Sequence, residues 1–139
     1  MKVLRVVLVS LLLSSCASQP SVVAEGEKCE NLIGVWTGED YYAERGIRTK
    51  WRLWRNSDST WSMEHSVTTV LGTRFVQKES GTWKCKEDTL YVHVDHIDEE
   101  LVDIPNTYHI VKAEDDENIL VILAGIDEIG MRFTAKRAD

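Results

Sequence analysis

The chain has 139 residues, of which 43% are hydrophobic and 28% are charged, and its formal net charge is −7 at pH 7. This length and composition are typical of one globular domain with its own hydrophobic core. The acidic excess argues against nucleic-acid binding, because phosphate backbones repel a negatively charged protein surface.

The N-terminus has the composition of an export signal. Two basic residues, Lys2 and Arg5, precede a predominantly apolar run at residues 6–13. This run is too short to span a bilayer as a helix, which takes about 20 residues. It has the length of the hydrophobic region of an export signal, about 7–15 residues. We therefore predict that residues 1–15 are a signal peptide and exclude them from the fold.

The end of this segment, Leu13-Ser14-Ser15-Cys16, resembles the bacterial lipobox. The resemblance implies cleavage before Cys16 and acylation of that cysteine, which then anchors the protein to a membrane by lipid chains. In Gram-negative lipoproteins an aspartate after the cysteine favours the inner membrane. Ala17 at this position implies the outer membrane, with the protein facing the periplasm. The alternative is an ordinary secretory signal with an incidental cysteine. Cleavage would remove two positive charges and leave a net charge of −9.

The other two cysteines, Cys29 and Cys85, are an even pair in a protein expected in an oxidising compartment. We predict a disulfide between them. Two free thiols or a metal-binding pair are the alternatives, but the sequence has no CxxC motif and no histidine close to either cysteine.

The exported chain divides into two parts. Residues 16–28 (CASQPSVVAEGEK) are small and polar, include proline and glycine, and show no apolar periodicity. We predict that they form a flexible tether. Residues 29–139 are the predicted folded domain.

Within this domain, apolar and polar residues alternate in short segments bounded by turn-forming residues, which is typical of β-strands. The predicted strands lie within 33–39, 46–56, 59–72, 73–86, 88–97, 106–113, 119–125 and 129–137. Residues 98–104 are predicted to be a loop or one helical turn. The short connections predict antiparallel pairing. An all-β barrel or sandwich of about eight strands is expected, because closure of the sheet removes exposed edges.

The first predicted strand carries Gly34-x-Trp36 within LIGVWTG, which resembles the G-x-W signature of lipocalins and lipocalin-like small barrels. SGTWKCKEDTLYV (80–92) is similar to the mid-chain hairpin of bacterial lipocalin-like domains. The resemblance implies an antiparallel up-and-down barrel that is closed at one end by Trp36 packed against an arginine of the last strand. Arg132 and Arg137 are the candidates. It also implies binding of a small apolar or amphiphilic ligand, although a narrow barrel filled by side chains is equally compatible with the size of the domain.

Tryptophan residues are the first candidates for a ligand site. Three of the five are assigned to the core, namely Trp36, Trp61 and Trp83. Trp51 and Trp54, with Arg52 between them, are the candidates for ligand contact at the mouth of the barrel. Trp54 and Arg52 are expected on the opposite face of their strand from Trp51, and Trp54 is expected to be partly exposed.

Two further patterns are candidate sites. His93 and Asp95 share a strand face and are able to hold a cation only with help from another strand, for which His65 or His109 are the donors. A solvent-facing polar stripe is the simpler interpretation, and no metal site or cofactor is predicted. Arg48, Lys50 and Arg52 form a basic strip that is either a solvated face or a contact for an anionic partner.

The sequence contains no catalytic motif, and we do not expect an enzyme. The leading hypothesis is an outer-membrane lipoprotein that binds a hydrophobic small molecule. The alternative is an envelope lipoprotein with a filled barrel that contacts another envelope protein. A hollow or a solid interior distinguishes these two hypotheses.

Overall fold

The computed structural model describes residues 24–139. The predicted signal peptide and Cys16 lie outside this range, as does most of the predicted tether. The described part of the tether, residues 24–28, lies mostly in two short elements, β1 (Ala24–Glu25) and the start of α1 (Glu27–Glu30). Ordered structure therefore begins before residue 29. No helix in the described part of the chain is long and apolar enough to cross a membrane.

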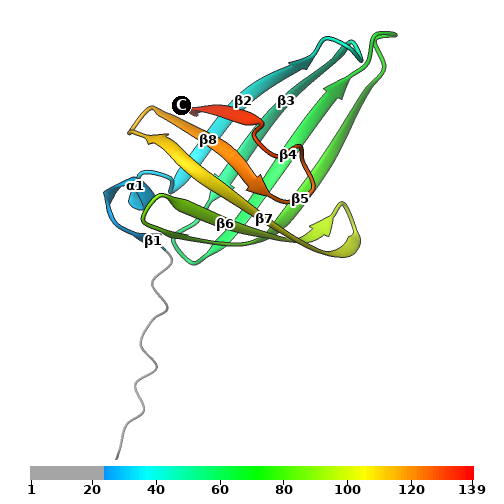
Figure 1. Ribbon diagram of the computed structural model, residues 1–139. Helices are drawn as coiled ribbons and strands as arrows, with labels where there is room; N and C mark the ends of the chain where they lie inside the picture. The colour runs from blue at the N-terminus through cyan, green and yellow to red at the C-terminus, as the bar shows by residue number, and fades with distance from the viewer. Residues whose placement is uncertain (1–23) are drawn as a thin grey trace, which may run out of the picture.

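Eight antiparallel strands form a closed up-and-down barrel (Figure 1), which confirms the predicted fold class. The strands are β2 (Gly34–Tyr42), β3 (Ile47–Arg55), β4 (Thr60–Thr68), β5 (Arg74–Lys86), β6 (Thr89–Ile97), β7 (Glu100–Ala113), β8 (Glu117–Ala124) and β9 (Arg132–Arg137). Each strand pairs with the next, and pairing of β2 with β9 closes the barrel. β1 is added to β5 in parallel. The architecture is consistent with a lipocalin-like barrel.

Two local predictions differ from the structure. Residues 98–104 are neither a loop nor a helical turn: Asp98 and Glu99 make the turn, and β7 begins at Glu100. The backbone N–H of Asp98 donates to Lys78 O at 2.7 Å, and the Asp98 carboxylate accepts from Lys78 N at 2.9 Å, so the turn is fixed to β5. The predicted strand at 59–72 is also too long, since β4 ends at Thr68 and Leu71 lies in the β4–β5 turn, where it is 90% exposed.

One end of the barrel is plugged. The ring of Trp36 is fully buried there, and its Nε1–H donates to Leu32 O at 2.9 Å. The Arg137 guanidinium lies over the Trp36 ring at 4.3 Å and donates to Ile33 O at 3.1 Å. Gly34 has φ +127°, and a side chain there would collide with Arg137. The glycine of the G-x-W motif therefore makes room for the arginine that covers the tryptophan.

Of the two arginines considered for this closure, Arg137 is the one in contact with Trp36. Arg132 is exposed at the start of β9, where it pairs with Val121 of β8. The difference follows from the direction of β9, which ends at the plugged end, so that only its last residue reaches the tryptophan.

The helix α1 crosses the plugged end and is held on two sides. Cys29 and Cys85 form a disulfide that joins α1 to β5, with their Cα atoms 5.6 Å apart. Asn31 Nδ2 donates to Ala113 O of β7 at 3.1 Å, and Lys28 forms an exposed ion pair with Asp88 at 2.7 Å. The opposite end of the barrel is formed by the β2–β3, β4–β5 and β6–β7 turns and the β8–β9 loop, and we refer to it as the mouth (Figure 1).

Candidate ligand-binding cavity

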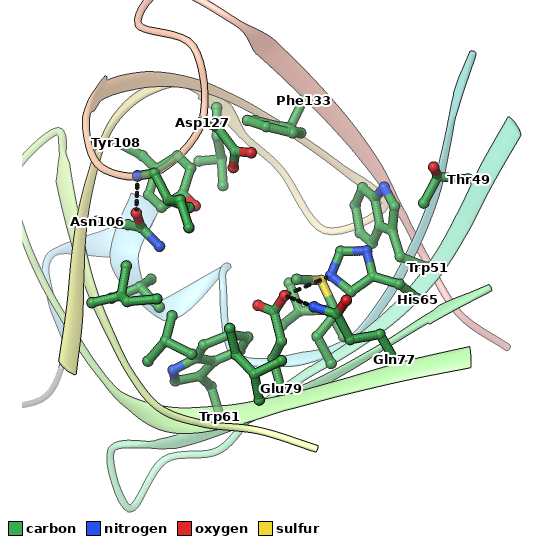
Figure 2. A pocket seen from close by; sticks show the side chains of 18 of the residues that line it. Thr49, Trp51, Trp61, His65, Gln77, Glu79, Asn106, Tyr108, Asp127 and Phe133 are labelled. Carbon is green, nitrogen blue, oxygen red and sulfur yellow. Dashed lines mark hydrogen bonds and ion pairs between the residues drawn. The ribbon is translucent and has the colours of Figure 1, made fainter. Parts of the chain in front are cut away.

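The barrel encloses a cavity of about 310 Å³ (Figure 2). Its lining is largely apolar and includes Trp51, Leu53, Trp61, Met63, Val94, Leu120 and Phe133. The polar lining residues are Asp40, Tyr42, Thr49, Arg55, His65, Gln77, Glu79, Asn106, Tyr108 and Asp127. The polar side chains are numerous, but most of the lining surface is apolar, as is usual for a small-molecule site.

Strand register orders the lining residues by depth. Arg55 pairs with Gly34 and with Trp61, and so lies at the level of the plugged end. Two residues nearer the mouth, Leu53 pairs with Met63, and two further on, Trp51 pairs with His65. Since a strand rises about 3.3 Å per residue, Arg55 is roughly 13 Å deeper along β3 than Trp51. Arg55 is therefore part of the cavity floor.

Trp51 of β3 points into the barrel, and its indole ring lies against Gly38 of β2. A side chain on Gly38, which pairs with Trp51, would overlap the indole ring. The indole Nε1–H donates to Asp40 Oδ2 at 3.0 Å, which satisfies the only polar group of the ring. The bare backbone at Gly38 and the Asp40 carboxylate together set the position of Trp51 in the cavity wall.

The floor of the cavity carries an unusual charge. The Arg55 side chain is buried, with 4% of the residue exposed, and its Nη1 has no hydrogen-bond partner within the described residues. Burial lowers the pKa of Arg55 to about 10, and the nearby Tyr108 opposes this shift. The guanidinium remains protonated at neutral pH, so a positive charge is held away from water.

Tyr108 of β7 is another polar residue that lines the cavity. Its ring packs edge-on against Phe133, with centroids 6.1 Å apart. Burial raises the pKa of the Tyr108 hydroxyl, and the charges of Asp127 and Glu79 raise it further, whereas Arg55 lowers it. The hydroxyl is therefore neutral and available as a hydrogen-bond donor.

Three acidic residues, Asp40, Glu79 and Asp127, also line the cavity, and Figure 2 shows Glu79 and Asp127 on opposite sides of it. Glu79 Oε1 accepts from Gln77 Nε2 at 3.0 Å and lies 3.4 Å from His65 Nε2. Partial burial raises the pKa of Asp127, and the charges of Glu79 and Asp40 raise it further, against the effect of His65. The cavity is thus polarised, with a positive floor and a negative upper wall.

The β8–β9 loop brings Asp127 to the cavity. Asn106 is buried on β7, and its Oδ1 accepts from the backbone N–H of Ile126 at 3.1 Å (Figure 2). A side chain on Gly125 would collide with Asn106, so this loop lies directly on the amide. Ile126 and Asp127 consequently line the cavity from the mouth side.

Among the sequence candidates for ligand contact, only Trp51 lines the cavity. Arg52 and Trp54 alternate with it on β3 and therefore lie on the outer face, where the guanidinium is 5.6 Å from the Trp54 ring centroid. Arg52 and Trp54 therefore do not contact the interior of the barrel, where a ligand would lie. Trp54 is half-buried on this outer face.

The three tryptophans assigned to the core, Trp36, Trp61 and Trp83, are buried, and Trp61 also lines the cavity. Trp61 donates from Nε1 to His93 O at 3.1 Å. Trp83 donates from Nε1 to Asn56 O at 2.9 Å beneath the β3–β4 turn. Each indole N–H is therefore satisfied by a backbone carbonyl, as a buried indole requires.

His93 and the basic strip do not line the cavity, whereas His65, named as a possible partner of His93, does. His93 contacts Asp95 through Nδ1 at 2.5 Å and Asp103 through Nε2 at 2.6 Å. The hydrogen bond to Asp103 raises the pKa of His93 most, and the hydrogen bond to Asp95 raises it further. Within residues 24–139 no group of His, Cys, Asp and Glu residues is arranged to hold a metal ion. In the basic strip, Arg48 and Lys50 share the carboxylate of Glu39, at 3.2 and 3.7 Å.

Sequence reasoning did not select Arg55, Tyr108, Glu79 or Asp127 as site residues. The strand alternation indicates the position of Arg55, because residues 51, 53 and 55 of β3 lie on the same face and Trp51 and Leu53 face inward. Asp127 carries none, because its position depends on how a loop folds over the mouth.

The chain matches no protein-family model and no curated protein sequence. The fold and cavity define its class, a closed eight-stranded up-and-down barrel with a polarised internal cavity.

Proposed function

We propose that this protein is an outer-membrane-anchored, periplasm-facing lipoprotein that binds a small apolar or amphiphilic molecule inside its barrel. The observation that carries the binding proposal is the cavity of about 310 Å³ with a mainly apolar lining. Its size lies at the lower end of the range usual for small-molecule sites, about 300–1,000 Å³. A single slender ligand fits this volume better than a bulky one.

The cavity supports ligand binding over the alternative of a filled barrel that acts as an envelope contact. In that alternative the basic strip is the contact surface, but two of its three side chains, Arg48 and Lys50, form ion pairs with Glu39. Exposed ion pairs of this kind contribute only about 0–1 kcal/mol, so a solvated strip of this type provides little specific recognition. The interior offers the more specific chemistry.

Ligand binding is expected to change the fluorescence of Trp51, because this indole lines the cavity. Titration with a fatty acid, a fatty alcohol and a lysophospholipid should give a saturable change with at least one of them. The change should persist in Trp54→Phe, whose indole is on the outer face, and should be smaller in Trp51→Phe, in which Trp61 is the remaining indole of the cavity lining. Absence of a saturable change with all three probes, together with no co-purified small molecule in native mass spectrometry, would reject ligand binding.

The membrane attachment rests on the lipobox resemblance at Leu13–Cys16. Cells fed a fatty acid that carries a chemical tag should incorporate the tag into the wild-type protein and not into Cys16→Ser. The wild-type protein should also fractionate with the outer membrane. Cys16→Ala provides a second unacylated control. Equal labelling of wild type and variants, or a wild-type protein free in the periplasm, would contradict this attachment.

A further inference from the structure

The buried guanidinium of Arg55 has no counter-ion in the described chain. No carboxylate of residues 24–139 forms an ion pair with it. Removing a charge from water is costly unless a partner of opposite charge and suitable geometry replaces the lost hydration. An arginine kept at the floor of an apolar cavity without such a partner is therefore unexpected for a purely structural residue.

The acidic groups of the cavity do not meet this need: Glu79 and Asp40 have other partners, and Asp127 enters from the β8–β9 loop at the mouth. Glu79 is engaged by Gln77 and lies beside His65, and Asp40 accepts from Trp51. Both lie nearer the mouth by strand register: Glu79 is at the level of Met63 and Asp40 at the level of Thr49. The register of the paired strands therefore keeps these two carboxylates apart from the Arg55 guanidinium.

We propose that Arg55 binds the carboxylate of a ligand that enters the barrel acid group first and leaves its apolar chain directed toward the mouth. This inference deepens the proposed function and depends on it. The guanidinium is suited to the role because its planar set of N–H donors matches the two oxygens of a carboxylate. The chain of the ligand then lies against Leu53, Met63 and Phe133.

The charges in the cavity favour this orientation and this head group. A ligand in the reverse orientation would place its carboxylate beside Glu79 and Asp127, where like charges repel. One unpartnered guanidinium neutralises one negative charge, so a singly charged carboxylate is better matched than a doubly charged phosphate. An amine of equal chain length would place a second positive charge against Arg55.

The first test compares decanoic acid, decanol and decylamine as probes, by calorimetry at neutral pH and below their aggregation concentrations. Wild-type protein should bind decanoic acid at least about tenfold more tightly than decanol, the range expected for hydrogen bonds to a charged group. Decylamine should bind more weakly than decanol. In Arg55→Met the preference for acid over alcohol should disappear while decanol still binds. Arg52→Met, on the outer face of the same strand, is the matched control and should behave as wild type.

Arg55→Met should also unfold at the same or a higher denaturant concentration than wild type, because an unpartnered buried charge is replaced by an apolar chain of similar length. Retained stability together with a lost acid preference indicates a binding group rather than a structural one. If Arg55→Met keeps the preference of the wild type, the inference is wrong and ligand binding as such is unaffected. If wild type binds none of the three probes, the proposed function fails with it.

A second measurement needs no variant. Decanoic acid labelled with ¹³C at its carboxyl carbon reports its own protonation by NMR. Bound at Arg55, the carboxylate should titrate at a lower pH than the free acid, because the guanidinium favours the charged form. Bound near the mouth, beside Glu79 and Asp127, it should titrate at a higher pH. An upward shift would overturn the proposed orientation, and a downward shift would support it.

Discussion

Replacing Trp36 by alanine is expected to lower the free energy of unfolding by about 3–5 kcal/mol, the usual cost of deleting a fully buried large aromatic side chain. The ring has no exposed surface, and it supports the Arg137 guanidinium that caps it at 4.3 Å. Its loss also leaves Leu32 O without the indole donor. Since small domains are stable by about 5–15 kcal/mol, the variant should be close to unfolding.

Equilibrium unfolding in urea, followed by far-ultraviolet circular dichroism, measures this loss. Trp54→Ala is the matched control, because Trp54 is half-buried on the outer face of β3. It should lose clearly less stability than Trp36→Ala. A Trp36→Ala protein within about 1 kcal/mol of wild type, the size of an average substitution, would show that the plugged end does not depend on this ring.

The second large effect is expected from the disulfide between Cys29 and Cys85. These cysteines are separated by 56 positions in the sequence. In the chain-entropy argument, a cross-link that closes a loop of this size stabilises the folded state by about 4 kcal/mol. The double variant Cys29→Ser, Cys85→Ser should be destabilised by about this amount, with α1 and β1 loosened first because the bond joins them to β5.

Wild-type protein unfolded with and without a reducing agent provides the comparison. The reductant should lower the stability of the wild type toward that of the double variant and should leave the double variant unchanged. Equal stability of oxidised wild type and double variant would contradict the expectation. A reductant effect on the double variant would show that the measurement reports something other than this bond.

Much of the fold was accessible from the sequence because alternation along strands is a local property. The strand segments and their antiparallel order follow from apolar periodicity and short connections. Residues 98–104 were not recognised as a strand, because acidic residues and the exposed Leu101 obscure the alternation of Val102 and Ile104, which face inward. For the arginine that packs against Trp36, the sequence leaves two candidates, Arg132 and Arg137. Only the direction of β9 in the structure selects Arg137.

The candidate site was less accessible, for a physical reason. Charged residues are usually exposed, so a sequence pattern alone does not single out Arg55 as a cavity residue, although it shares the face of Trp51 and Leu53 on β3. The acidic wall depends on contacts between distant strands and a loop, such as the hydrogen bond from Ile126 to Asn106. Local pattern carries no information about such contacts.

The parallel pairing of β1 with the last residues of β5 determines where the chain enters the barrel. Ala24 lies opposite Cys85, beside the helix that covers the plugged end, whereas the mouth is at the other end (Figure 1). If the chain is attached through Cys16, the described domain is joined to its anchor from the plugged end. The length of residues 16–23 then sets how closely the mouth approaches the membrane from which or into which a cargo passes.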